Sequence, residues 1–61
     1  MTPDELRVAA VARFKQGKDT LANGDPEQAV ALFQKALELS PESAQVRRTL
    51  RDTQRKVIPQ G

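Results

Sequence analysis

Apolar residues recur with a helical period in three segments of the chain, and turn residues separate these segments. The pattern predicts helices over about 3–22, 26–39 and 43–57. The second segment is apolar around much of its circumference, so we expect it to be the most buried. Its apolar residues are Ala29, Val30, Leu32, Phe33, Ala36, Leu37 and Leu39. The fold class that follows is all-α.

Residues suited to helix ends mark the boundaries of these segments. Thr2 and Glu5 have the spacing of a capping box at the start of the first helix. Gly24 can take the left-handed conformation that closes this helix, and Asp25 is a good N-cap for the next. Ser40-Pro41 ends the second helix. These signals predict a helical hairpin followed by a third helix that caps it.

The first helix has one apolar stripe and two valines, Val8 and Val11, that lie off it. The stripe consists of Leu6, Ala10, Phe14, Gly17 and Leu21. A glycine inside a helix costs about 1 kcal/mol relative to alanine. We expect close approach of the second helix to compensate, with Ala29 and Phe33 packing beside Gly17.

The third helix combines a narrow apolar stripe with most of the positive charge. Its stripe is Val46, Leu50, Thr53 and Val57. Residues 1–46 hold five Lys/Arg and seven Asp/Glu, a net charge of −2, whereas residues 47–61 hold five Lys/Arg and one Asp, a net charge of +4. Two interpretations stay open: a solvated helix face, or a basic patch for an acidic peptide, nucleic acid or membrane. The patch would consist of Arg47, Arg51, Arg55 and Lys56.

Composition argues against catalysis. The 61 residues include no cysteine and no histidine, which removes thiol nucleophiles and the commonest general base and metal ligand. The carboxylates cluster at helix starts, where capping and the helix dipole explain them. No phosphate-binding glycine loop or EF-hand spacing occurs. We therefore predict no enzyme, no catalytic residue, no cofactor and no metal. With no visible signal peptide or membrane-length segment, we expect a cytoplasmic chain.

From Ala10 to Ser43 the chain resembles the tetratricopeptide repeat, a helical hairpin of about 34 residues. Four residues stand at matching positions of that pattern: Gly17, Ala29, Phe33 and Pro41. Ala36 and the turn at Gly24-Asp25 also resemble the family's usual small residue and turn. The first helix departs from it, because Arg13, Gln16 and Thr20 stand where Trp, Leu and Tyr are common. The third helix resembles the opening helix of a next repeat, with Leu50 in a matching place.

The resemblance implies a domain over 1–58, with a repeat core at 10–43, a capping helix at 43–57 and a frayed tail at 59–61. It also implies a non-catalytic module or scaffold that binds a protein or peptide in a groove lined by opening helices. The corresponding residues are Val11, Phe14, Lys15, Lys18, Arg48 and Asp52. Their mixture of cationic and apolar groups favours an acidic or amphipathic partner. Core packing for Phe14, and solvation for Lys15 and Lys18, are the alternatives.

A single repeat does not bury its own hydrophobic face, because repeats of this kind stabilise each other by stacking. The chain is therefore a fragment, or a partner or second copy completes its core. We hypothesise homo-oligomeric self-association through Leu6, Val8 and Val11 of the long first helix. The alternative is that these residues pack on the third helix of the same chain. Nucleic-acid or membrane binding by the basic patch is a less favoured alternative, because few aromatic residues are present to stack on bases.

Overall fold

The computed structural model describes residues 2–57, and within them the chain forms three helices. These are α1 (Pro3–Ala22), α2 (Pro26–Leu39) and α3 (Ala44–Val57). The all-α prediction is confirmed, and the helix bounds agree except that α3 begins one residue later than expected. Ser43 instead precedes α3, and its hydroxyl accepts a hydrogen bond from the Val46 N–H at 3.4 Å. The predicted frayed tail at 59–61 lies outside the described residues.

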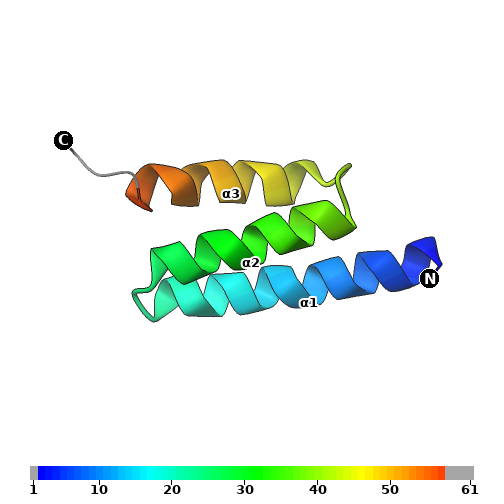
Figure 1. Cartoon of the computed structure of the whole chain (residues 1–61), viewed down its shortest axis with the longest axis horizontal. Coiled ribbons are helices and arrows are strands. Elements are labelled where there is room, and N and C mark those ends of the chain that lie inside the picture. The colour runs from blue at the N-terminus through cyan, green and yellow to red at the C-terminus, as the bar shows by residue number, and fades with distance from the viewer. Residues whose placement is uncertain (1, 58–61) are drawn as a thin grey trace.

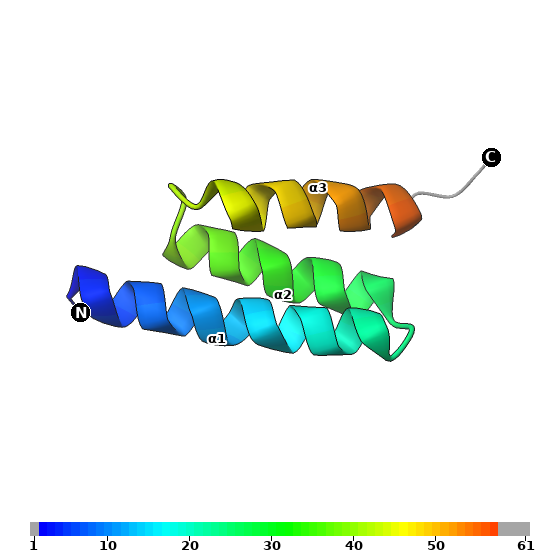
Figure 2. The same ribbon diagram turned by 180° about the vertical axis from the view of Figure 1, so that it is seen from behind.

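Consecutive helices run antiparallel, and α2 lies between α1 and α3 (Figures 1 and 2). The molecule measures 43 × 20 × 14 Å along its principal axes. The longest helix is α1, and its N-terminal end extends past the loop that joins α2 to α3 (Figure 1). The central position of α2 explains why this helix is apolar around so much of its circumference.

The two helices of the hairpin meet most closely where Gly17 of α1 faces Phe33 of α2. Phe33 has no exposed surface, and a Cβ atom added to Gly17 would lie 2.5 Å from its Cε1 atom. Ala29 and Ala36 are also fully buried, and Leu50 joins Phe33 and Ala29 in the core cluster. The expectation that Gly17 admits the second helix is confirmed, because only a glycine leaves room for this ring.

Local hydrogen bonds fix the turn between α1 and α2. Gly24 has a φ of +88°, the left-handed conformation expected at a helix C-terminus. Its N–H donates to the Leu21 carbonyl at 3.0 Å, and the Asp25 N–H donates to the Thr20 carbonyl at 3.1 Å. These two bonds form a Schellman motif. The Asp25 carboxylate then caps α2 by accepting from the Gln28 N–H at 3.3 Å.

The third helix packs on α2 through the predicted stripe. Val46, Leu50 and Thr53 are buried. Thr53 is only 1% exposed, and its hydroxyl donates to the Thr49 carbonyl at 2.8 Å. This bond satisfies a polar group that would be costly to bury alone. Among the helices of residues 2–57, none has the length and apolarity needed to cross a bilayer.

Candidate protein-interaction surfaces

Phe14 is the predicted contact residue that the structure ties most closely to the core. Its ring centroid lies 5.4 Å from that of Phe33, with the planes tilted by 49°. Phe14 is nevertheless only half-buried. The Lys18 ammonium lies 5.5 Å from its ring centroid, within the range of a cation–π interaction. The residue therefore packs in the core, as the alternative interpretation held, and still presents part of its surface to solvent.

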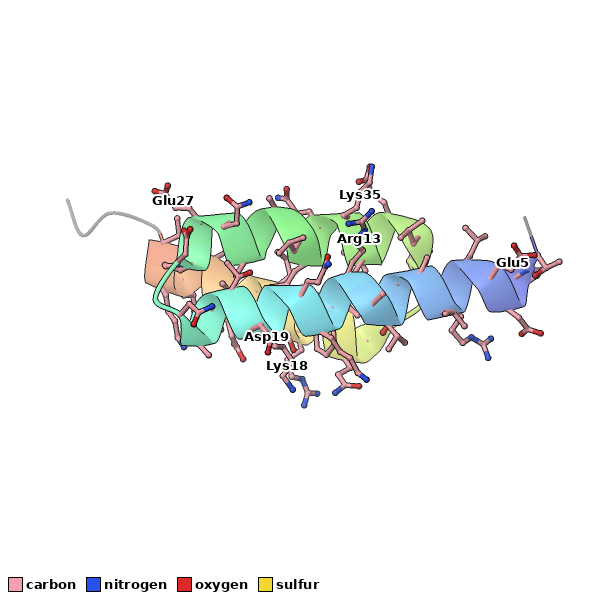
Figure 3. All side chains as sticks on the ribbon, turned by 90° about the horizontal axis from the view of Figure 1, so that it is seen from below. Glu5, Arg13, Lys18, Asp19, Glu27 and Lys35 are labelled. Carbon is pink, nitrogen blue, oxygen red and sulfur yellow. The ribbon has the colours of Figure 1, made fainter. Side chains whose placement is uncertain are left out.

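The other predicted groove residues are exposed on two helices. Lys15 lies on α1, and Arg48 and Asp52 lie on α3. Val11 of α1 is 49% exposed, a large value for an apolar side chain. Figure 3 shows Lys18 on the edge of α1 opposite to Arg13. Exposed charged and apolar groups therefore occur together on α1, as a peptide-binding surface requires.

One residue of the basic patch predicted on α3, Arg47, contacts the α2–α3 loop. Arg47 donates a hydrogen bond from its Nη2 atom to the Pro41 carbonyl at 3.1 Å, so its guanidinium helps to fix the α2–α3 loop. Arg51, Arg55 and Lys56 are exposed. Arg55 and Lys56 occupy the last turn of α3, where positive charge is favourable with the helix dipole.

The residues proposed for self-association differ in their exposure. Val8 is 69% exposed and Val11 is 49% exposed, whereas Leu6 is half-buried. The alternative that these residues pack on α3 is wrong for the two valines, because they lie in solvent. Leu6 contributes to the side of α1 that faces the rest of the molecule.

A hollow on α1 includes residues that the sequence analysis did not single out. It measures about 390 Å³ and is lined by Asp4, Glu5, Val8, Ala9 and Ala12. The alanines form its low points, and Asp4 and Glu5 place negative charge at one end. The spacing of these residues by three and four along one helix was a signal in the sequence. It was overlooked because alanines contribute little to an apolar stripe. A second hollow lies on α2 at Gln34, Leu37 and Glu38.

The described residues offer little for catalytic chemistry. Among residues 2–57, no group of three acidic side chains is placed to hold a metal ion. Glu42 is exposed, and hydrogen bonds from its own backbone and from the Ser40 hydroxyl lower the pKa of its carboxyl. The bond from the Ser40 hydroxyl to Glu42 Oε1 is 3.0 Å long and lies in the α2–α3 loop. Its position indicates a structural role.

Comparison with family models places this helical arrangement among known proteins. A family model described as Tetratricopeptide repeat matches residues 20–56, which is more than half of the 61 residues. The chain belongs to the tetratricopeptide repeat family. The match covers the end of α1, all of α2 and nearly all of α3. No curated protein and no solved structure gives a significant match.

The family indicates a general class of function for this chain. Members of this family generally act as protein-interaction modules, and the repeat itself is not catalytic. Gly17 and Phe33 are in close contact between α1 and α2, and the Phe14 ring, Lys18 and the hollow of α1 keep exposed surface beside this contact. The chain therefore combines the fold of a protein-interaction family with apolar side chains that are accessible to solvent.

Proposed function

We propose that this chain is a non-catalytic interaction module that holds a peptide or helix of a partner protein against α1 and α3. The contact residues would be Val11, Phe14, Lys15, Lys18, Arg48 and Asp52. The observation that supports this proposal is the half-buried Phe14 ring, which packs on Phe33 and has the Lys18 ammonium over it. An aromatic surface beside a cation suits a segment that has both apolar and acidic side chains.

The proposed partner is therefore an amphipathic acidic segment. Its apolar residues would contact Phe14 and Val11, and its carboxylates would pair with Lys15 and Lys18. Exposed ion pairs contribute little individually, typically less than about 1 kcal/mol. Affinity would come from the buried apolar contacts, and the charges would select the partner.

Titration of the ¹⁵N-labelled chain with a helical peptide of leucine and glutamate tests this proposal. We expect shifts of the amide resonances around Phe14 and Lys18, and weaker binding of a peptide with lysine in place of glutamate. Lys18→Glu should weaken binding of the acidic peptide about fivefold. Lys35→Glu, which makes the same charge change at an exposed position of α2, serves as the control. Equal weakening by the two variants would contradict a defined site.

A second candidate is binding of an anionic polymer through Arg51, Arg55 and Lys56. The observation that favours it is the exposure of these three cations on one helix. A single-stranded oligonucleotide and vesicles of anionic lipid are suitable probes. Binding that falls steeply with salt, and is lost in an Arg51→Glu and Arg55→Glu double variant, would support it. Absence of binding at low salt would exclude it.

A further inference from the structure

An exposed stripe on α1 lies opposite to the side that packs in the core. We call Glu5, Val8, Ala12 and Lys15 the outer stripe; all four are exposed. Their spacings alternate between three and four residues, so at about 100° per residue they fall within about 80° of arc. The buried Ala10 and Gly17 lie on the other side of the helix. Figure 3 views the molecule from this side of α1.

We propose that two copies of this chain associate through the outer stripe, with their α1 helices antiparallel. The hollow described above provides the shape for this contact. Ala12 is one of its low points, and Val8 projects beside it with 69% of its surface exposed. In an antiparallel pair, Val8 of one copy lies opposite Ala12 of the other, and the two-fold axis repeats the contact. At each of the two equivalent contacts, the larger valine side chain then fills the space above the smaller alanine.

Charge selects both the orientation and the register of this pair. The register that sets Val8 against the partner's Ala12 also sets Glu5 against the partner's Lys15, and symmetry gives this ion pair twice. A parallel pair would instead bring glutamate beside glutamate and lysine beside lysine, which is unfavourable. Sliding the antiparallel pair by one heptad would place Val8 opposite Asp19 or Glu5. The charges therefore favour one arrangement.

The side chain of Glu5 can make this contact without losing its local role. Its Oε1 atom accepts a hydrogen bond from the Thr2 hydroxyl at 3.1 Å as part of the capping box at the start of α1. The bonds within residues 2–57 engage this oxygen and leave Oε2 for the partner's Lys15. The outer stripe is therefore complementary to a second copy of itself. This complementarity points to a second copy of this chain as the molecule that binds there.

The size of the stripe sets the strength of association. Stable protein interfaces bury about 1,200–2,000 Å² in total. The contact proposed here covers one face of a helix that is about 30 Å long at ~1.5 Å per residue, so it lies at or below the lower end. We therefore expect a weak, rapidly exchanging dimer with a Kd on the order of 10⁻⁴–10⁻³ M. This surface stands apart from the peptide site proposed above, with Lys15 as the only shared residue.

Sedimentation equilibrium of the full chain from micromolar to millimolar concentration tests the proposal. The unsubstituted chain should shift from monomer to dimer, and Lys15→Glu should weaken this at least about fivefold by placing glutamates face to face. Lys35→Glu, the control with the same net charge, should dimerise as the unsubstituted chain does. An equimolar mixture of Glu5→Lys and Lys15→Glu chains should regain association, because both ion pairs reform between unlike copies. Circular dichroism checks that each variant stays helical.

Introduced cysteines test the orientation directly, because the chain has none of its own. Val8→Cys and Ala12→Cys chains are mixed in equal amounts and oxidised at millimolar concentration. The antiparallel pair predicts that the mixed disulfide far exceeds the half of all disulfide-linked dimers that random pairing would give. A monomer throughout, equal dimerisation of Lys15→Glu and Lys35→Glu, or a statistical mixture of disulfides would each overturn the proposal. Peptide binding is measured at micromolar concentration, where the chain is monomeric. The loss or retention of peptide binding therefore does not depend on whether the chain dimerises.

Discussion

The two halves of α1 use small residues in opposite ways. In the C-terminal half, Gly17 is buried because the ring of Phe33 occupies the space that a side chain would fill. In the N-terminal half, Ala9 and Ala12 form the low points of a hollow that no other part of residues 2–57 fills. A small residue therefore creates room for a neighbour, and its position relative to α2 decides whether another part of the same chain fills that room.

The side of α1 that each residue occupies accounts for this difference, and the unequal lengths of the helices add to it. α1 has 20 residues, whereas α2 and α3 have 14 each. The N-terminal end of α1 therefore extends past its neighbours and keeps an exposed side (Figure 2).

The largest effect should follow from removal of the ring at the closest contact. Phe33→Ala creates a cavity in the centre of the molecule, and such changes cost about 3–5 kcal/mol. A domain of this size has about 3–5 kcal/mol of stability in total. We expect the variant to be largely unfolded at 25 °C, as measured by circular dichroism at 222 nm. A cooperative urea transition at the unsubstituted midpoint would contradict this account of the core.

A smaller loss is expected when the gap at Gly17 is filled. Gly17→Ala gains about 1 kcal/mol of helix propensity but must displace the Phe33 ring, and overpacking costs about 1–3 kcal/mol. We expect a net loss of up to about 2 kcal/mol in urea denaturation. Gln16→Ala, at the exposed neighbouring position, is the matched control.

The cause of this loss can be isolated with a second substitution. Phe33→Leu removes the ring atoms nearest to Gly17, so Gly17→Ala should be better tolerated in that background. A double-mutant cycle measures the coupling. A Gly17→Ala chain that keeps the full gain in helix propensity, and is about 1 kcal/mol more stable than the unsubstituted chain, would show that the helices are not in close contact here.

Substitution in the exposed half of α1 should leave the monomer almost unchanged. Val8→Ser alters a side chain that is 69% exposed, and surface changes of this kind usually stay within about ±0.5 kcal/mol. Thermal denaturation at micromolar concentration measures the effect on the monomer. A loss comparable to that of Gly17→Ala would show that Val8 belongs to the core of the chain.

The smallest expected effect concerns the pH dependence of the α2–α3 loop. Hydrogen bonds from its own backbone and from the Ser40 hydroxyl lower the pKa of Glu42 below its ordinary value of 4.5 in the folded chain. The charged Glu42 carboxylate therefore stabilises the folded chain above pH 4.5, and this stabilisation is lost as the pH falls through the folded-state pKa. We expect Glu42→Gln to reduce the midpoint of thermal unfolding slightly at pH 7 and not at pH 3. An equal reduction at both pH values would assign the effect to something other than this charge.

Much of the fold could be predicted from the sequence because the residues at the helix ends and the period of the apolar residues indicate the same helices. Thr2 and Glu5, then Gly24 and Asp25, set helix ends that the structure reproduces. The contact of Gly17 with Phe33 could also be predicted, since a glycine inside a helix needs a compensating neighbour. The predicted boundaries of the repeat and the contact residues stay predictions.

The surfaces were harder to predict because exposure depends on how far each helix extends past its neighbours. The period of α1 separates Leu6, on its apolar stripe, from the exposed Val8 and Val11, but it does not reveal that Leu6 stays only half-buried. The role of Arg47 was also missed, because its bond to the Pro41 carbonyl depends on the path of the loop. Such features come from tertiary geometry and leave little trace in a pattern of apolar residues.

The packing of Phe33 against Gly17 is tested most directly by nuclear Overhauser effects in the ¹³C,¹⁵N-labelled chain. The account predicts strong effects between the Hα protons of Gly17 and the ring protons of Phe33, with the glycine resonances displaced by the ring current. Glycine resonances at random-coil positions, with no effect to this ring, would contradict it.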